Sequence, residues 1–563
     1  MKNMWRNFSG KALRGCVGAV AGLWLSCTGA QQLTFGSDPT LLAKTALGEE
    51  QGSVVVGVWR DGQAAYAFRQ NGGADRDSAS APAAVQAQQL YEIGSISKVF
   101  TGLLLAQAVE KGDLTLEDKL GALLQGKATL TSPEVASITL RQLITHSACV
   151  PRLPPDFSEN YVEDNPYAAY DRRRLWFALS TLKLKTSPPC AASYSNFGVG
   201  IVGEILSERY GKPWHVLVRE NITSPLGMSD TVQLLGDKAA RMAQGFNNAT
   251  PSSLWDFQAL AGAGALRSTA ADMLVFSRAI MAGPSGPLGP AVERLLTPLG
   301  RYESGQIGYA VMMRGPAERR TFFHGGGTGG YRTLWMVAPD TQEAVVAFTS
   351  NAHAQPNKVL VSLTASRYPV AATTTVLGPD QLAEYAGVFR IDEATAFTFV
   401  LQDGALYRRI TGAGFRPLLP AGPNTFTDAE VGVQYVFTRQ AGVVAGVDYT
   451  QGGGSMSGTR TNEPVPATAV VPIEQQQAYV GRFHLARLLR RNLDFDVKAE
   501  GGQLAVRSRD WPRQPVFPMA GQPDRFTYEK GTAQLQFERD ASGKVVALVL
   551  HEGGAMRMQR QPE

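Results

Sequence analysis

The chain has 563 residues, more than one hydrophobic core accommodates, so several domains are expected. Hydrophobic residues make up 44% of it and charged residues 18%, which excludes wholesale disorder. Four of its five net positive charges lie in the first 30 residues, at Lys2, Arg6, Lys11 and Arg14. The remainder is nearly neutral, so composition offers no basic field for nucleic acid.

The N-terminus has the pattern of an export signal. Basic residues precede an apolar run over 16–25, and small residues follow at Thr28-Gly29-Ala30. This order predicts a signal peptide over residues 1–30 and a periplasmic or secreted protein. The run is too short to cross a bilayer, and no later segment is long enough, so no membrane span is expected. A lipid anchor at Cys27 is the alternative, although Trp24 stands where lipoprotein signals usually carry Leu.

Hydrophobic periodicity then predicts an α+β domain over residues 31–370. Two strands surround the Asp61-Gly62 turn within 53–69, a polar loop covers 71–88, and a helix begins at Ser95 and ends near Gly112. Further elements are listed by residue range: helices around 141–147, 197–210 and 269–282, a Pro/Gly loop over 283–290, strands at 307–313, 320–323, 332–338 and 343–349, and a helix at 356–366. Strands at both ends with helices between them favour an antiparallel sheet that joins the two ends.

The remainder contains an internal repeat. Tyr385-Ala386-Gly387-Val388-Phe389 resembles Tyr479-Val480-Gly481-Arg482-Phe483, and the correspondence continues in order from Leu406, Phe426 and Phe437 to Leu504, Phe526 and Phe537. We therefore expect two small antiparallel β-barrel-like or sandwich repeats, over residues 371–465 and 466–563, joined by a linker at 463–473.

Ser95-Ile96-Ser97-Lys98 is the first motif that bears on chemistry. A serine that opens a helix is ordinarily only an N-cap. Here, however, Lys98 lies one helical turn along, where its amine can take the serine proton. The helix N-terminus adds positive potential where an oxyanion forms.

Tyr194-Ser195-Asn196 precedes a helical run and is, taken alone, an ordinary turn with a buried tyrosine. A functional role requires nearby cations to depress the pKa of the Tyr194 phenol, so that it shuttles protons between nucleophile and leaving group. Asn196 would then donate to a substrate carbonyl.

The third motif runs from His324 through Gly325, Gly326 and Gly327 to Gly330, between predicted strands. Glycine in a strand marks a bulge or a close backbone approach. An extended ligand that pairs with this edge explains the lack of side chains, and the N–H of Gly327 completes an oxyanion hole with that of Ser95. A phosphate loop is disfavoured because no Gly-Lys-Ser/Thr follows.

In this order, Ser-x-x-Lys, Tyr-x-Asn and His-x-Gly resemble the three signatures of penicillin-recognising serine hydrolases. The flanking segments, listed here, resemble the β-lactamase-related subgroup of class C enzymes, D-alanyl-D-alanine carboxypeptidases, esterases and D-aminopeptidases over residues 45–366: Ile144-Thr145-His146-Ser147, Pro225-Leu226-Gly227-Met228, 264–272 and 326–332.

The resemblance implies a β-lactamase/transpeptidase-like fold, with Ser95 acylated and Lys98 and Tyr194 sharing the general-base and general-acid roles. Which of the two takes the proton first stays open. Asn196, His324, Gly326 and Gly327 would bind substrate. His146 is expected to be a structural turn residue, and no metal or organic cofactor is expected.

Two departures from the family pattern each introduce a cysteine. Ser147-Ala148-Cys149-Val150 stands where Thr-Ser-Gly-Leu is usual, and Pro189-Cys190-Ala191 where Pro-Gly-Thr is common. This paired change favours a Cys149–Cys190 disulfide in an oxidising compartment, with two buried free thiols as the alternative.

A third departure concerns His324, which replaces the lysine of β-lactamases and carboxypeptidases. Histidine is mostly neutral near pH 7, so we expect substrates that need no free carboxylate next to the scissile bond. D-Aminopeptidases of this family combine His-x-Gly with two barrel domains.

The sequence thus predicts an exported serine hydrolase that acts on an amide or ester of a small molecule or peptide, D-aminopeptidase-like or esterase-like. A β-lactamase or D,D-carboxypeptidase is the alternative. A penicillin-binding receptor without turnover, or a scaffold, is the alternative of a different class. The oligomeric state is not predicted.

Overall fold

The computed structural model describes most of the chain beyond the N-terminal segment. The residues described are 33–72, 86–157, 159, 162, 164–370, 375–393, 395–411, 413–428, 431–452, 454–465, 471, 473–485, 493–500, 503–508, 513–519, 522–528, 533–551 and 555–562. The expected signal peptide, Cys27 and most of the 71–88 loop lie outside them. Within the described part, no helix has the length and apolar character needed to span a membrane.

An eight-stranded antiparallel sheet forms the centre of the first unit, in the order β2-β1-β12-β11-β10-β9-β8-β7. Its strands are β1 (Gly52–Arg60), β2 (Gln63–Asn71), β7 (Gly300–Tyr302), β8 (Gly305–Ile307), β9 (Met312–Arg314), β10 (Thr321–Gly327), β11 (Arg332–Ala338) and β12 (Glu343–Thr349). Because β1 pairs with β12 from Val54↔Thr349 to Trp59↔Ala344, the two ends of the unit meet as predicted.

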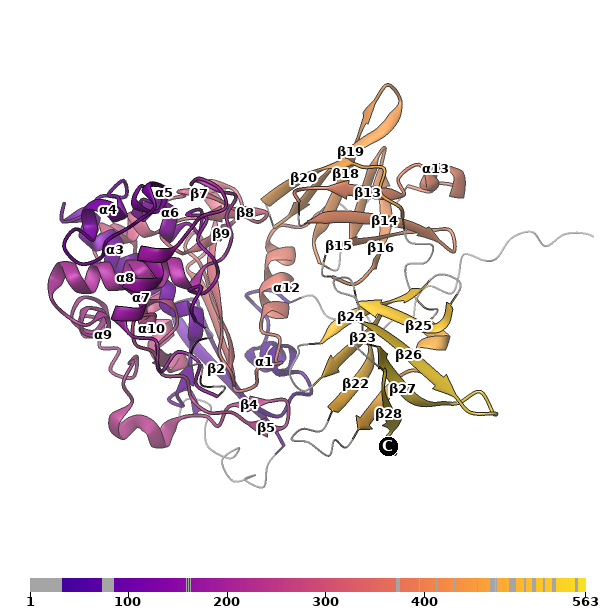
Figure 1. Ribbon diagram of the computed structural model, residues 1–563, viewed down its shortest axis with the longest axis horizontal. Coiled ribbons are helices and arrows are strands. Elements are labelled where there is room, and N and C mark those ends of the chain that lie inside the picture. Colours follow the sequence, from indigo (N-terminus) through magenta and orange to yellow (C-terminus); the bar gives the residue numbers. More distant parts are fainter. Residues whose placement is uncertain are drawn as a thin grey trace, which may run out of the picture. The chain divides into compact units, whose positions relative to one another are not determined.

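Side chains of the central strands alternate between two cores. Val55, Val346 and Phe348 face the helical region, whereas Val54, Val56 and Val345 pack with α1 (Pro39–Leu47) and α12 (Asn357–Arg367). Figure 1 shows these two helices on one face of the sheet and the larger helical region on the other. The unit is therefore an α+β sandwich of helices around an antiparallel sheet, as expected.

The helical region carries most of the candidate site residues predicted from the sequence. Its longer helices are α3 (Ser97–Glu110), α7 (Arg172–Thr181), α8 (Asn196–Tyr210) and α10 (Ala270–Met281). Its shorter helices are α4 (Leu120–Leu123), α5 (Pro133–Ala136), α6 (Leu140–Ile144), α9 (Trp214–Val218) and α11 (Ala291–Leu295). Two small sheets pair β3 (Tyr91–Glu92) with β6 (Arg267–Ser268) and β4 (Phe246–Asn247) with β5 (Thr250–Pro251).

Two of the predicted strands were wrong in extent. The segment 307–313 is not one strand, because Ala310 adopts a left-handed conformation and the Gly308 N–H donates to the Val311 carbonyl, which separates β8 from β9. The strand predicted at 320–323 continues through the glycines to Gly327, because these residues pair with β11 as far as Gly327↔Arg332. The strands predicted at 332–338 and 343–349 are confirmed.

The C-terminal region forms two closed eight-stranded antiparallel barrels, which confirms the predicted repeat. The first comprises β13 (Gly387–Arg390), β14 (Ala396–Gln402), β15 (Ala405–Ile410), β16 (Arg416–Gly422), β17 (Thr425–Asp428), β18 (Val433–Gln440), β19 (Val443–Gln451) and β20 (Gly454–Arg460). The second comprises β21 (Gly481–Leu485), β22 (Leu493–Glu500), β23 (Gln503–Ser508), β24 (Gln514–Met519), β25 (Gln522–Tyr528), β26 (Gln534–Arg539), β27 (Val545–His551) and β28 (Ala555–Arg560). The short helices α13 (Pro379–Ala383) and α14 (Ile473–Gln476) precede the barrels.

The repeated aromatic residues have equivalent positions in the two barrel cores. Tyr385 lies 4.7 Å from Phe426 and 4.8 Å from Phe437 between ring centroids. In the second barrel the corresponding distances from Tyr479 to Phe526 and Phe537 are 5.2 and 4.9 Å. The internal sequence repeat thus corresponds to an equivalent aromatic cluster in each barrel.

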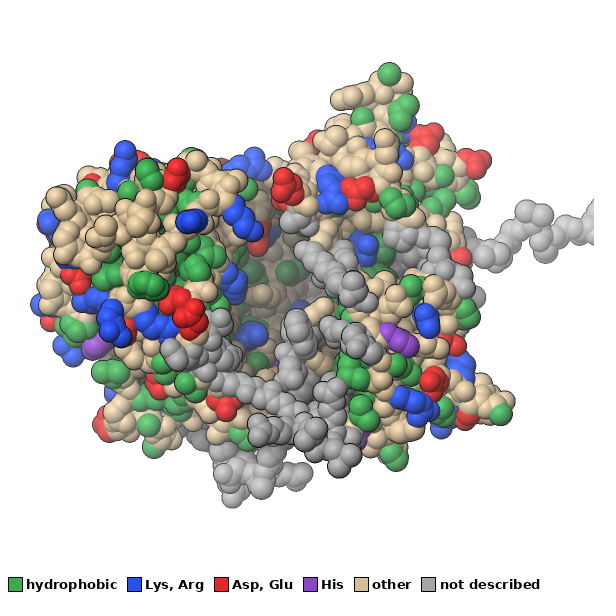
Figure 2. All heavy atoms as spheres, viewed as in Figure 1, with side chains coloured by type: hydrophobic (Ala, Val, Ile, Leu, Met, Phe, Trp, Pro, Cys, Tyr) green, Lys and Arg blue, Asp and Glu red, His purple; other side chains and the backbone are tan. Residues whose placement is uncertain are grey.

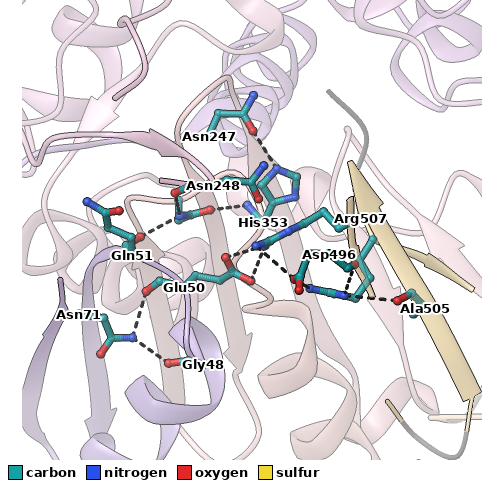
Figure 3. A network of polar contacts seen from close by, with 12 residues as sticks. Gly48, Glu50, Gln51, Asn71, Asn247, Asn248, His353, Asp496, Ala505 and Arg507 are labelled. Carbon is teal, nitrogen blue, oxygen red and sulfur yellow. Dashed lines mark hydrogen bonds and ion pairs between the residues drawn. The ribbon is translucent and has the colours of Figure 1, made fainter. Parts of the chain in front are cut away.

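A polar network connects the second barrel with the segment before β1 (Figure 3). Arg507 in β23 donates from Nη1 to both carboxylate oxygens of Glu50, at 2.9 and 2.8 Å, and its Nη2 lies 3.7 Å from Asp496. Nearby, His353 Nε2 lies 2.8 Å from Asn247 Oδ1. Burial lowers the pKa of His353 to about 4, and the charge of Arg507 acts in the same direction.

Acidic and basic side chains are interspersed on the face of the molecule in Figure 2. That distribution agrees with the nearly neutral charge of the chain beyond its first 30 residues.

Replacing Phe437 by alanine tests the barrel core. Phe437 is 3% exposed and contacts four other aromatic rings, so the substitution is expected to destabilise the first barrel by about 3–5 kcal/mol. Hydrogen–deuterium exchange of the full chain should show faster exchange in β13–β20, and Phe537→Ala should do the same in β21–β28. Phe177→Ala is the control because Phe177 is 60% exposed. Unchanged exchange in Phe437→Ala would contradict the shared cluster.

Candidate active site

Ser95 lies in a tight turn at the head of α3. The 3₁₀ turn η2 (Gly94–Ile96) contains it, so the α-helix itself begins two residues later than predicted, at Ser97. Gly94 has φ +51°, and a Cβ there would lie 2.7 Å from the Gly327 nitrogen. Only glycine fits this position, so the Ser95 turn packs directly against the end of β10.

Lys98 is fully buried beside Ser95. Its Nζ lies 3.1 Å from Ser95 Oγ, 2.8 Å from Asn196 Oδ1 and 2.6 Å from the Ala263 carbonyl oxygen. Burial lowers the pKa of Lys98 well below its ordinary value, and the positive charge of Arg152 lowers it further. A neutral amine here can donate two hydrogens to Asn196 and Ala263 and direct its lone pair to the Ser95 hydroxyl.

Tyr194 reaches the same place from the loop before α8. Lys98 Nζ lies 4.8 Å from the centroid of its ring, and the Arg152 guanidinium carbon lies 5.1 Å from it. The expected depression of the Tyr194 pKa is wrong for this structure. Burial raises that pKa above its ordinary value, against the opposing influence of the Ser95 hydroxyl and of the Arg152 charge. The phenol therefore retains its proton.

A disulfide joins the loop that contains His146 and Arg152 to the loop that contains Tyr194. Cys149 and Cys190 are bonded, with their Cα atoms 5.4 Å apart. Backbone hydrogen bonds run beside it, from the Cys190 N–H to the Ser147 carbonyl and from the Ser193 N–H to the His146 carbonyl. These contacts fix the chain immediately before Tyr194. The structure thus contains the disulfide rather than the two free thiols.

His146 occupies a left-handed turn with φ +61°, which agrees with the predicted structural role. Its ring also lies 4.6 Å from that of Tyr194. Burial lowers the pKa of His146 well below its ordinary value. Its Nδ1 accepts a hydrogen bond from the Ser195 N–H, at 3.3 Å, so its hydrogen lies on Nε2. Sequence spacing gave no sign that this turn residue lines the site.

Asn196 links Lys98 to a third loop. Its Oδ1 accepts from Lys98, and its Nδ2 donates to the Tyr167 hydroxyl at 2.9 Å. Ser195 caps α8 by accepting from the Gly198 N–H. The helix therefore begins at the residue that holds the lysine.

The predicted His324 and its glycines form the free end of β10. Strand β9 pairs with β10 only at Thr321, Phe322 and Phe323, so the glycines keep an edge that β9 does not cover. A Cβ on Gly326 would lie 2.0 Å from the Ile93 carbonyl oxygen, which excludes any side chain there. An extended ligand can therefore approach this edge closely, next to Ser95.

His324 is 1% exposed, and its Nδ1 lies 2.6 Å from the Gly325 carbonyl oxygen. Burial lowers the pKa of His324 to about 3, against the opposing influence of its hydrogen bond with the Gly325 backbone. The neutral ring carries its hydrogen on Nδ1 and leaves Nε2 as a buried acceptor without a protein partner in the described residues. His324 is therefore no cation at neutral pH.

Two residues of the site, Arg152 and Tyr302, were not predicted from the sequence. Arg152 follows the His146 turn and stacks on Tyr194, and Tyr302 at the end of β7 lies 5.8 Å from His146 between ring centroids. Neither belongs to a motif, and Tyr302 comes from a strand of three residues. Among the described residues, no group of three or more His, Cys, Asp or Glu is placed to hold a metal ion.

The family model described as Beta-lactamase matches residues 44–365, more than half of the chain. The chain belongs to the Beta-lactamase family. Membership confirms the family predicted from the three motifs and supports an enzyme of this serine-hydrolase family. It also agrees with the α+β fold of the first unit.

Three relatives illustrate the range of similarity. The D-alanyl-D-alanine-carboxypeptidase/endopeptidase AmpH of Escherichia coli K12 is 31% identical over 191 residues, which are 34% of this chain and 48% of AmpH. Penicillin-binding protein 4* of Bacillus subtilis is 21% identical over 387 residues, 63% of this chain and 84% of that protein. The crystal structure of a class C β-lactamase from Rhodobacter sphaeroides has a TM-score of 0.47 at 22% identity, covering 56% of this chain and 94% of that one. The chain spans about half the length of AmpH.

Replacing both Cys149 and Cys190 by serine tests the disulfide. Its loop spans a sequence separation of 41, so loss of the bond is expected to cost roughly 4 kcal/mol of stability. Urea denaturation of the wild type and the double variant measures the difference. Alkylation of the denatured, unreduced wild type followed by peptide mass spectrometry should leave both cysteines unmodified, and finding them alkylated would contradict the bond.

Proposed function

We propose that this protein is an exported serine hydrolase that cleaves an amide or ester through an acyl-enzyme on Ser95. The observation that carries the proposal is the Lys98 amine, fully buried and 3.1 Å from the Ser95 hydroxyl. Export rests on the signal-like pattern of residues 1–30.

In acylation, Lys98 acts as the general base. Its lone pair takes the proton from the Ser95 hydroxyl as Oγ forms a bond to the substrate carbonyl carbon. The pKa of Lys98, lowered by burial, keeps the amine unprotonated and ready for this step. The carbonyl π electrons move to oxygen, where the N–H groups of Ser95 and Gly327 are the proposed donors to the oxyanion.

Tyr194 is the proposed general acid. Because burial keeps its phenol protonated, it can give that proton to the leaving nitrogen or oxygen as the carbonyl–leaving-group bond breaks. The Lys98 ammonium then returns a proton to the phenolate, which restores both groups. A water molecule attacks the acyl-enzyme, and its proton passes back to Ser95 Oγ as the ester bond breaks.

His324 bears on the class of substrate. A lysine in its place would supply a permanent cation, whereas burial lowers the pKa of His324 to about 3 and keeps it neutral. The site therefore favours substrates with no carboxylate at the position His324 faces, such as D-aminoacyl amides or short acyl esters. A D,D-carboxypeptidase or β-lactamase activity is the second candidate, because AmpH carries the first of these names.

Measuring the turnover of esters, D-aminoacyl amides and cephalosporins by the full chain tests the proposal. Steady hydrolysis of p-nitrophenyl acetate and of D-aminoacyl amides is expected, with cephalosporins much poorer substrates. Ser95→Ala should lower kcat by at least about 1000-fold, because the nucleophile is lost. A fluorophosphonate probe should label Ser95 in the wild type only.

Three outcomes would contradict parts of this proposal. Undiminished hydrolysis by Ser95→Ala would contradict an acyl-enzyme on Ser95. Cephalosporins far better than D-aminoacyl amides and esters would overturn the substrate preference. Labelling of Ser95 without steady turnover would indicate a receptor.

The pH profile of kcat/KM for an uncharged ester tests the assignment of the base. Activity should rise as pH rises through the lowered pKa of Lys98, well below 10.5, and should fall only above the ordinary range of tyrosine, where Tyr194 loses its proton. Arg152→Ala should move the acid limb to higher pH, since the Arg152 charge lowers the pKa of Lys98.

Arg173→Ala is the matched control for this profile, because Arg173 is an exposed arginine on α7. It should leave the acid limb in place. An acid limb that is the same in the wild type and in Arg152→Ala would contradict the electrostatic coupling between Arg152 and Lys98.

A further inference from the structure

The Tyr194 ring is surrounded by hydrogen-bond donors that lack acceptors. The guanidinium of Arg152 stacks on the ring, and its side chain is exposed. In the part of the chain that the structure describes, this guanidinium makes no ion pair or hydrogen bond. Its backbone is nevertheless fixed, because the Arg152 carbonyl accepts from the N–H groups of Asn196 and Phe197 at the start of α8. The Arg152 backbone is thus fixed beside the site, while the N–H groups of its planar guanidinium stay accessible.

Two further donors lie beside it. The Nε2 of His146 carries that ring's hydrogen, is buried, and has no partner among the described residues. Tyr302 lies near the same rings, and its hydroxyl makes no hydrogen bond within the described part. Two of these side chains, His146 and Arg152, come from one loop, and Tyr302 comes from β7. The buried donor among them is His146 Nε2, and a buried donor without an acceptor is costly unless a ligand satisfies it.

The charges around this ring favour an anion. Besides Arg152, the ionisable groups that face it are Lys98, His146, His324, Tyr167, Tyr302 and, next to Tyr302, Glu303. Burial lowers the pKa values of Lys98, His146 and His324, which disfavours their charged forms, whereas the guanidinium of Arg152 is exposed and stays charged at all ordinary pH values. Glu303 is 65% exposed and lies 3.9 Å from Arg314. A guanidinium fork with two neutral donors matches a carboxylate, which accepts several hydrogen bonds in one plane.

We propose that Arg152, together with His146 and Tyr302, forms a subsite for a carboxylate carried by the leaving group of the substrate. The inference rests on the proposed function, since Tyr194 protonates the leaving atom and Arg152 stacks on Tyr194. The His324 ring lies 6.3 Å from the Tyr194 ring between centroids, but burial lowers its pKa to about 3. Arg152, rather than His324, is therefore the group that supplies positive charge to this carboxylate.

Two pairs of esters test the subsite with the full chain. Phenyl acetate and 3-carboxyphenyl acetate differ only by a carboxylate on the leaving group, and phenyl butyrate and monophenyl succinate differ by one on the acyl group. The readout is the ratio of kcat/KM for the charged and the neutral ester, measured at one pH on the plateau of the profile. A general defect in folding or in the base affects both esters of a pair and leaves the ratio unchanged.

The wild type should prefer 3-carboxyphenyl acetate, and Arg152→Ala should lower that ratio by roughly 10-fold or more, because a charge-assisted pair is lost. Arg152→Lys should recover part of the preference, and Tyr302→Phe should lower the ratio by roughly 3-fold. Arg173→Ala removes the same charge elsewhere and should leave the ratio unchanged.

A ratio that Arg152→Ala leaves unchanged would overturn the subsite. So would a ratio that falls for the succinate pair alone, since the carboxylate would then belong to the acyl side. Ser95→Ala distinguishes failure of the proposed function from failure of the subsite. Persistent turnover in that variant would overturn the acyl-enzyme mechanism, whereas the ester ratio in Arg152→Ala tests the subsite alone.

Discussion

A buried amine that contacts three oxygen atoms organises the centre of this protein. Lys98 belongs to α3, Asn196 begins α8, and Ala263 lies in the segment before β6, so one side chain connects three parts of the helical region. A charged ammonium at this depth is unfavourable, and loss of its proton relieves that cost. The same burial that makes the lysine a structural link therefore prepares it to accept a proton.

The phenol of Tyr194 depends on a different constraint, since its loop has no regular structure of its own. The Cys149–Cys190 bond and the adjacent backbone hydrogen bonds hold that loop against the His146 turn. The departures from the family pattern at these two positions thus form a compensating pair. They provide a covalent connection between two loops that lie beside Ser95 and Lys98.

Local patterns predicted what local physics determines. The spacing of Ser95 and Lys98, the strands at 332–338 and 343–349, and the repeated aromatic residues were predictable because each depends on neighbours in sequence or on periodicity. The turn at Ala310, the side chains of Arg152 and Tyr302 around the site, and the raised pKa of Tyr194 were not. Each of these depends on a left-handed residue, on long-range contacts or on burial, which a single sequence does not display.

The uncovered edge of β10 has a consequence for selectivity. A strand edge without side chains offers a visiting molecule only N–H and C=O groups at fixed intervals, and every peptide-like backbone can match that spacing. In the proposed function, binding at Gly325–Gly327 would therefore be indifferent to the identity of the residue bound there. Discrimination among molecules that fit the edge would fall to the loops around the opening, which can change while Ser95 and Lys98 stay the same.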